Sequence, residues 1–307
     1  MKSKLALLII FGVIPFCLIE SKRPTLEDFP RIEDHELKTK LTDFCFNEFS
    51  QFGEDGIIEK IFEIIGTTSK IAIEFGAYDG IYCSNVARLW KKKGWKAILI
   101  EGDKKRFKKL IENTKNYDCL ALCQYIGIEP NNNIEAILRK IEINDEIDLL
   151  SIDIDGNDYY VFQSLQELKP RVVILEYNPT IPATLDAHQP YDPESKGSGF
   201  GASVAALNRI AQSKGYSLIA ITICNCIFIR NDLSKPFNQF ETSLRKIQFE
   251  GFLKYITTDF SGKYMILGTH KLAPFSIGET APIDTLTGKV CKFPSQLKIS
   301  NWTNNFS

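Results

Sequence analysis

Ile71-Ala-Ile-Glu-Phe-Gly-Ala-Tyr-Asp-Gly80 joins a short apolar run to a turn that carries two glycines. The apolar run is typical of a buried strand, and glycines in the turn that follows let the backbone approach a ligand closely. The turn differs from the G-x-G-x-x-G of dinucleotide-binding enzymes, because Tyr78 and Asp79 separate the glycines. A bulky side chain and a negatively charged one at these positions hinder the binding of a negatively charged pyrophosphate group. A ligand that carries a cation therefore fits this turn better.

The alternation of strand and helix patterns extends from Ser50 to Arg230. Apolar, β-rich runs predict strands at 71–75, 97–100, 120–122, 147–152, 172–175, 216–223 and 226–230. Helical spacing of apolar residues predicts helices at 54–65, 84–93, 104–116, 133–142, 158–168 and 203–214. Near-continuous apolar strands that alternate with helices predict an α/β fold, with a mostly parallel sheet and helices on both faces.

Acidic residues stand at the ends of four predicted strands. They are Glu74, Glu101, Asp153 together with Asp155, and Glu176. Open parallel sheets bind ligands beyond the carboxyl ends of their strands, so these acids mark the expected site. Glu101 lies 25 residues beyond Gly76 (101 − 76), at the end of the neighbouring strand. An acid there can accept hydrogen bonds from both ribose hydroxyls of an adenosine. A glycine turn with this acid suggests a ligand with adenosine but no phosphates, and S-adenosylmethionine meets that description.

A series of short motifs runs in consistent order through residues 50–230. The motifs are Ser50-Gln-Phe-Gly-Glu-Asp-Gly56, the Glu74–Gly80 turn, Leu99-Ile-Glu-Gly-Asp103, Asp148-Leu-Leu-Ser-Ile-Asp-Ile-Asp-Gly-Asn-Asp158, Val173-Ile-Leu-Glu-Tyr-Asn-Pro179, Gly201-Ala-Ser203, Lys214-Gly-Tyr216 and Asn225-Cys-Ile-Phe-Ile-Arg230. As a set they resemble the FkbM-like methyltransferases. The resemblance implies a Rossmann-like class I methyltransferase sheet of seven strands, with S-adenosylmethionine as methyl donor and often a hydroxyl as acceptor.

The resemblance also implies roles for particular residues. The donor-binding turn corresponds to Glu74, Gly76, Ala77 and Gly80, the ribose acid to Glu101, and the acidic motif after the fourth strand to Asp153 and Asp155. Tyr78 departs from the family pattern, since many methyltransferases carry glycine at that position. Because a strand-end acid that lines a pocket supports no core packing, replacing Glu101 is expected to change thermal stability little.

The Asp153-Ile-Asp155 motif leaves a second enzyme class open. Metal-dependent glycosyltransferases also place D-x-D after an apolar run, where oxygen ligands hold magnesium or manganese against a nucleotide diphosphate. The earlier glycine turn and Glu101 are not required by such an enzyme, so the methyltransferase ranks first and no metal is expected. A secreted, non-catalytic binding protein on a methyltransferase scaffold is the third alternative.

Methyl transfer to a hydroxyl of a small molecule or glycan requires a group that removes the proton. Asp155, Glu176 and His188 are the candidates for this base, and His188 lies in a Pro-rich loop at 179–193. Gln51 precedes the first strand and is expected to approach the donor. Its neighbours Glu54 and Asp55 are expected to do the same, and capping of the helix at 54–65 explains all three residues equally well.

The N-terminus carries a targeting pattern. Lys2 and Lys4 precede an unbroken apolar run at 5–19, which predicts that residues 1–22 form a secretory signal or an uncleaved signal anchor. Either leads to secretion or to membrane association, and an anchored domain can face the cytoplasm.

Composition and the segments on either side of residues 50–230 complete the sequence-based expectations. Thirty-seven basic residues balance 38 acidic ones, so the net charge of −1 offers no footprint for nucleic acid. Residues 23–49 form a charged lead-in to the methyltransferase-like domain at 50–230. Residues 231–307 lose the strand–helix rhythm and are expected to form a small β-rich C-terminal appendage or flap. Cys224 and Cys226 alternate on a predicted strand and are expected to pack in the core.

Overall fold

The computed structural model describes residues 39–194 and 200–248, together with the backbone of 254–258, 264–268 and 283–284. The predicted signal or anchor at 1–22 lies outside the described residues. Among the residues described, no helix combines the length and apolar character needed to cross a membrane.

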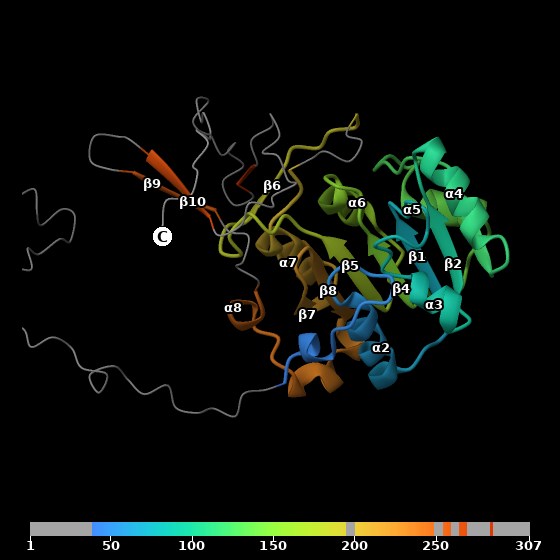
Figure 1. The fold of residues 1–307 in the computed structure, drawn as a ribbon, viewed down its shortest axis with the longest axis horizontal. Helices are drawn as coiled ribbons and strands as arrows, with labels where there is room; N and C mark the ends of the chain where they lie inside the picture. The colour runs from blue at the N-terminus through green and yellow to red at the C-terminus, as the bar shows by residue number, and fades with distance from the viewer. Residues whose placement is uncertain (1–38, 195–199, 249–253, 259–263, 269–282, 285–307) are drawn as a thin grey trace, which may run out of the picture. The chain divides into compact units, whose positions relative to one another are not determined.

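The predicted strands and helices are present with small changes of bounds (Figure 1). The strands are β1 (Ile71–Phe75), β2 (Lys96–Ile100), β3 (Cys119–Leu122), β4 (Leu149–Ile152), β5 (Val172–Glu176), β6 (Ala187–His188), β7 (Tyr216–Ile221), β8 (Asn225–Arg230), β9 (Lys254–Thr258), β10 (Tyr264–Gly268) and β11 (Ile283–Asp284). The α-helices are α2 (Glu54–Ile65), α3 (Ala87–Lys92), α4 (Lys104–Thr114), α5 (Ile134–Lys140), α6 (Asp158–Ser164), α7 (Val204–Ser213) and α8 (Leu244–Ile247). The 3₁₀ turns are η3 (Leu41–Phe44), η4 (Asn231–Leu233) and η5 (Lys235–Gln239).

Seven strands form one sheet in the order β3-β2-β1-β4-β5-β8-β7. The pairs β1–β2, β1–β4, β2–β3 and β4–β5 are parallel, whereas β8 runs antiparallel to both β5 and β7. A seven-stranded sheet with this order and a single reversed strand is the Rossmann-like class I methyltransferase fold, as the sequence predicted.

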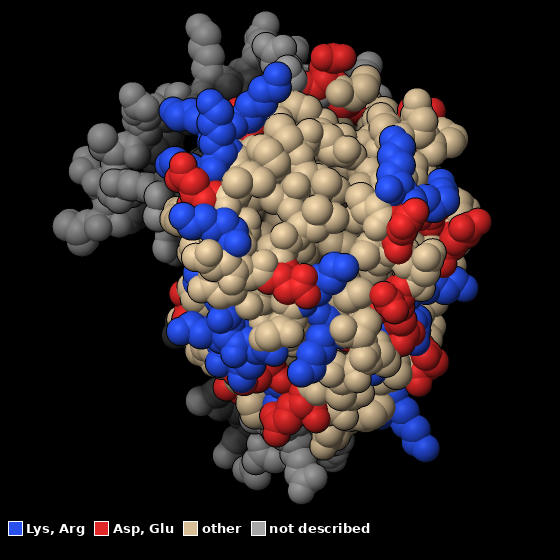
Figure 2. All heavy atoms as spheres, turned by 90° about the vertical axis from the view of Figure 1, so that its right-hand side faces the viewer, with Lys and Arg blue, Asp and Glu red and all other residues tan. Residues whose placement is uncertain are grey.

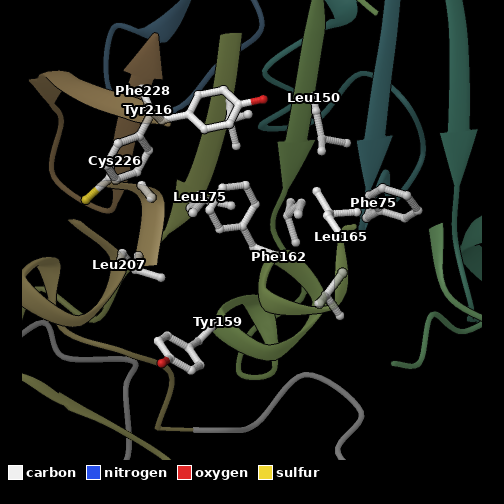
Figure 3. Packing of buried hydrophobic residues seen from close by; sticks show 14 of the residues in the cluster. Phe75, Leu150, Tyr159, Phe162, Leu165, Leu175, Leu207, Tyr216, Cys226 and Phe228 are labelled. Atoms are coloured by element: carbon white, nitrogen blue, oxygen red, sulfur yellow. The ribbon is translucent and has the colours of Figure 1, made fainter. Parts of the chain in front are cut away.

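Alternation along the strands divides the core between the two faces. On one face, Ile73, Phe75 and their equivalents pack against α5, α6 and α7, with Phe162 at the centre (Figure 3). On the other face, Ala72 and Leu99 pack against α2, α3 and α4. Phe162 is fully buried, and burial of such a side chain stabilises the fold by about 1.5–3 kcal/mol.

Two predicted helix bounds were wrong. Helix α3 begins at Ala87 rather than at 84, and the Ser84 hydroxyl accepts the backbone N–H groups of Val86 and Ala87 at 3.2 and 3.0 Å. Helix α6 ends at Ser164 rather than at 168, because a carboxylate oxygen of Glu135 accepts the three N–H groups of residues 166–168. In α6 a polar side chain outside the helix thus binds backbone groups that would otherwise continue it.

The chain after β8 is partly helical. Residues 231–248 form η4, η5 and α8, and Phe237 and Phe240 pack into the α2–α4 core cluster. Beyond them, β9 pairs with β10, and β11 pairs with β6 near His188. Cys224 and Cys226 are buried free thiols, which confirms their assignment to the core.

Candidate functional site

The carboxyl ends of the parallel strands bring the predicted acids together. Glu74 in β1, Ser151 in β4 and Glu176 in β5 alternate with residues packed under α5–α7, so they project on the face that α2 and α3 cover. The antiparallel partner of Glu176 is Asn225, the first residue of β8. Five strands therefore contribute to one polar edge, counting Glu101 directly after β2.

The glycine turn after β1 leaves no room for side chains. Gly76 has φ +72°, and a Cβ there would collide with the carbonyl oxygen of Asp153. Ala77 is buried and donates its N–H to the carbonyl oxygen of Ile100 at 3.1 Å. Gly80 has φ +80°, and a Cβ there would lie 2.6 Å from Leu110 Cδ1. The turn is thus fixed against β2, β4 and α4.

Tyr78 adopts the left-handed conformation within this turn. Its φ is +50°, in the left-handed region that favours glycine and that other side chains adopt only at a cost. Its side chain is 36% exposed, and the guanidinium of Arg106 lies 4.5 Å from the ring centroid. The conformation is held from outside the turn, because the Tyr78 N–H donates to Glu101.

Glu101 is a buried carboxylate with both oxygens engaged. Its Oε2 accepts the N–H of Tyr78 at 2.9 Å, and its Oε1 accepts the N–H of Asp103 at 2.6 Å. The residue is 5% exposed. Each carboxylate oxygen keeps a further lone pair for a ligand hydroxyl. Glu101 therefore holds the turn at Tyr78 as well as facing the site, so its replacement is expected to cost more stability than the sequence indicated.

Glu74 is the centre of a buried hydrogen-bond network. Its carboxylate accepts the Ser84 hydroxyl at 2.6 Å and the Asn85 N–H at 2.7 Å, and the Asn85 amide donates to the Ser151 hydroxyl at 3.0 Å. Burial raises the pKa of Glu74 to about 7, and the charge of Asp55 adds to this rise. Glu74 therefore shapes the turn and the start of α3 from beneath the site.

Asp153, Asp155 and Glu176 form a carboxylate cluster. One oxygen of each lies within 4.8 Å of the other two. The N–H of Asp155 donates to Glu176 Oε2 at 3.2 Å. Burial, and then the charges of neighbouring carboxylates, raise the pKa values of Asp153 and Glu176 well above the usual range.

Asp158, the first residue of α6, supports this cluster. Its two oxygens accept the N–H groups of Ile154 and Gly156 at 3.0 and 2.9 Å, which closes the loop around Asp155. Asp155 has φ +55° in this loop. Burial raises the pKa of Asp158 to about 7.

His188 lies in a separate aromatic cluster. Its ring stacks on Tyr159 at 4.1 Å and meets Tyr160 edge-on. Its Nδ1 lies 2.8 Å from the Gln189 carbonyl oxygen and 3.1 Å from the Tyr160 hydroxyl. A carbonyl oxygen only accepts, so Nδ1 carries the proton and Nε2 is the basic nitrogen. Burial, followed by the charge of Arg209, lowers the pKa of His188, so the ring is neutral at pH 7.

The residues before β1 divide between exposed and structural positions. Gln51 is exposed and offers its carbonyl oxygen to Asn47. Asp55 Oδ2 accepts three consecutive N–H groups at 48–50, which belong to the loop before α2, so the explanation of Asp55 as a cap of this helix was wrong. Glu54 is fully buried and accepts from the Thr222 hydroxyl and the Asn225 amide, which ties α2 to β8.

A cavity of about 370 Å³ lies elsewhere, between α2 and α3. Its lining includes Phe62, Leu89 and Trp95, with Glu59 and Arg88 among the charged residues. None of the predicted site residues, all of which are described, lines it. The carboxyl edge of the sheet remains the candidate site.

Sequence reasoning missed Asn225, Asp158 and Arg106 as parts of this edge. Asn225 and Asp158 stand within motifs that carry the family resemblance, which was an available signal. Nothing in the local sequence around Arg106 indicated that its charge acts on Asp155.

Comparison with known proteins returns methyltransferases among solved structures. An S-adenosylmethionine-dependent methyltransferase from Clostridium acetobutylicum ATCC 824 is 10% identical, with 58% of this chain and 90% of that chain covered and a TM-score of 0.37. Precorrin-6y C5,15-methyltransferase from Geobacter metallireducens GS-15 is 9% identical, with 60% and 90% covered and a TM-score of 0.35. Magnesium protoporphyrin IX methyltransferase from Synechocystis PCC 6803, with bound SAH, is 10% identical, with 58% and 81% covered and a TM-score of 0.37.

These likenesses are too weak to carry an argument about activity. The fold assignment rests on the strand order and directions described above. No protein-family model matches the sequence, and no curated protein matches it.

Proposed function

We propose that this chain is an S-adenosylmethionine-dependent methyltransferase that methylates an oxygen of a sugar or another polar small molecule. The observation that carries the proposal is the Glu101 carboxylate, which two backbone N–H groups hold beside the Gly76–Gly80 turn. In this position its remaining lone pairs suit the two hydroxyls of a ribose. The motifs that resemble the FkbM-like family favour a hydroxyl as acceptor.

The residues at the edge of the sheet fit the donor. Gly76 has no side chain, so the donor can approach the backbone of the turn closely. A Cβ at this position would also collide with the backbone of Asp153. The surrounding carboxylates of Glu74, Asp153 and Glu176 suit a ligand that carries positive charge. When bound, the donor supplies a methyl group on a sulfonium. The protein's part is to orient the adenosine through Glu101 and to attract the cation.

The acceptor hydroxyl must lose its proton as it attacks. Asp155 and Glu176 stand together beyond β4 and β5, and a carboxylate with a raised pKa is a stronger base near neutral pH. His188 is a neutral base with Nε2 free of the contacts that hold Nδ1. We rank Glu176 first, because the Asp155 N–H orients it and because burial, followed by the charges of neighbouring carboxylates, raises its pKa.

The charge distribution suits a small acceptor. Figure 2 shows basic and acidic side chains mixed around a central uncharged area, so this face has no continuous field of one sign. A sugar or another neutral polar molecule is compatible with such a surface.

Isothermal titration separates the two enzyme classes. We expect S-adenosylmethionine to bind the full-length protein without added metal, and we expect binding to survive EDTA. Manganese-dependent binding of a UDP-sugar, with no binding of S-adenosylmethionine, would reverse the ranking in favour of a D-x-D glycosyltransferase. The glycosyltransferase stays a candidate because of the cluster of Asp153, Asp155 and Glu176.

We also propose that residues 1–22 take the chain to a membrane or through it. The support is the basic residues Lys2 and Lys4 before a 15-residue apolar run at 5–19. A C-terminally tagged full-length protein should be found in a membrane or secreted fraction. Protease protection would then report which side the domain faces, and uniform cytosolic distribution would refute the proposal.

A further inference from the structure

Three oxygens of the carboxylate cluster lie at the spacing of a cation site. The oxygens belong to Asp153, Asp155 and Glu176 and lie within 4.8 Å of one another. Opposite ligands of a six-coordinate Mg²⁺ are about 4.2 Å apart, and those of Ca²⁺ about 4.6–5.2 Å apart. Oxygens that lie within 4.8 Å of one another can therefore share one cation of this class.

The buried Asn225, next to the carboxylate cluster, has an oxygen to which no described residue donates a hydrogen bond. Asn225 lies directly opposite Glu176 in the β5–β8 pair, so both side chains project on the same face. It is 2% exposed, and its Nδ2 donates to Glu54 Oε1 at 3.0 Å. Its Oδ1 is buried and has no hydrogen-bond partner among the described residues. A buried acceptor left unpaired costs about 1–3 kcal/mol, and a water bound to a metal would supply the missing donor.

The loop that carries Asp155 is held in place before any ligand binds. Asp158 accepts the N–H groups of Ile154 and Gly156, and the Asp155 N–H donates to Glu176. These bonds fix the backbone on both sides of Asp155 but leave its carboxylate exposed. A cation site with preorganised ligands loses less entropy on binding.

We propose that Asp153, Asp155 and Glu176 bind a hard divalent cation, Mg²⁺, Mn²⁺ or Ca²⁺, with water in the remaining coordination positions. Carboxylate oxygens are the ligands that this class of cation prefers. The sequence alone led us to expect no metal, and the convergence of β4, β5 and β8 changes that expectation. The proposal does not rest on methyl transfer, since cation binding is measured without donor or acceptor. With an ion bound, Glu176 is one of its ligands, so the ranking of Glu176 as the base applies to the ion-free protein.

The experiment titrates Mn²⁺ into the full-length, EDTA-treated protein and follows free Mn²⁺ by electron paramagnetic resonance, with Ca²⁺ titrated by calorimetry in parallel. We expect saturable binding at one ion per chain for at least one of the two ions. Tighter Mn²⁺ binding would identify a magnesium-type site, and tighter Ca²⁺ binding a calcium site. Failure of both ions to bind saturably to the wild-type protein would overturn the proposal.

Asp155→Asn tests the location, because its exposed side chain can change without loss of core packing. We expect it to weaken binding by at least about tenfold, and Glu176→Gln to do the same. Asp118→Asn is the matched control, since Asp118 is an exposed acid before β3, and it should bind like wild type. If the Asp155→Asn protein is folded by circular dichroism and binds the ion as tightly as wild type does, the ion binds elsewhere. That result would refute the assignment of the site to Asp153, Asp155 and Glu176.

Discussion

Replacing Glu101 by alanine removes the contact on which the proposed function depends. The substitution deletes the acceptor of the Tyr78 and Asp103 N–H groups together with the proposed acceptor of both ribose hydroxyls. The structure therefore separates two consequences: a loss of stability that is measurable without ligand, and a loss of donor affinity that exceeds it.

The magnitudes follow from these bonds. Hydrogen bonds to a charged group contribute about 1.5–3 kcal/mol each and are not additive, so two ribose hydroxyls account for roughly 2–4 kcal/mol. At about 1.4 kcal/mol per factor of ten, Glu101→Ala should weaken S-adenosylmethionine binding roughly 30- to 1,000-fold. Water can reach the partly exposed Tyr78, so we expect about 2 kcal/mol of lost stability for the two backbone groups together.

Calorimetric titration and urea unfolding measure the two consequences on the same preparation. Glu101→Gln should lose less of both, because its amide oxygen still accepts. Asp103→Ala is the control: it removes the side chain that accepts the Lys105 and Arg106 N–H groups at the start of α4 but keeps the N–H that Glu101 accepts. It should lower stability and leave donor affinity near wild type. A folded Glu101→Ala protein with wild-type affinity would show that the adenosine does not lie beside Glu101.

Three further outcomes are expected. Asp148→Ala should lower the free energy of unfolding by about 3–5 kcal/mol in urea, with little change in m-value, because it leaves the buried Arg171 guanidinium, 2.5 Å from Asp148 Oδ1, without its counter-charge. Gly76→Ala should abolish measurable donor binding in calorimetry and lower the melting temperature, since the added methyl meets Asp153; a stable variant that binds normally would contradict the described turn. The pKa of Glu74 is raised to about 7 from the usual 4.5, so the folded state holds this proton more tightly than the unfolded chain does. The stability that the protonated Glu74 contributes is therefore complete below about pH 4.5 and is lost as pH rises through about 7. Between about pH 5 and pH 7.5, a range on either side of this pKa, the melting temperature should fall less in Glu74→Gln than in wild type. Equal falls in melting temperature for the two proteins would refute the raised pKa of Glu74.

The sequence by itself determined the elements. The apolar run at 71–75 predicted a buried strand, and all five residues of β1 are buried. It also determined that acids stand at the strand ends, because the carboxyl end of a buried strand is readable from where its apolar run stops. Glu101 was found in this way, from its distance along the chain to the glycine turn.

Only the tertiary structure decided which polar groups meet. Glu135 ends α6 by accepting the N–H groups of residues 166–168, and Glu74 in β1 accepts the Ser84 hydroxyl and the Asn85 N–H before α3. Local pattern predicted α6 correctly in kind but not in length, since a hydrogen bond to a distant side chain can outcompete the next helical bond.

The same limit applies to the site. The reversal of β8 sets Asn225 opposite Glu176, although 49 residues separate them in the sequence (225 − 176). Packing on α6 draws His188 into the tyrosine cluster, and α4 brings Arg106 within reach of Asp155. Apolar periodicity reports which side of an element is buried, because removing apolar side chains from water drives folding. The partners of buried polar groups depend on strand order and direction, which the chain acquires only when it folds.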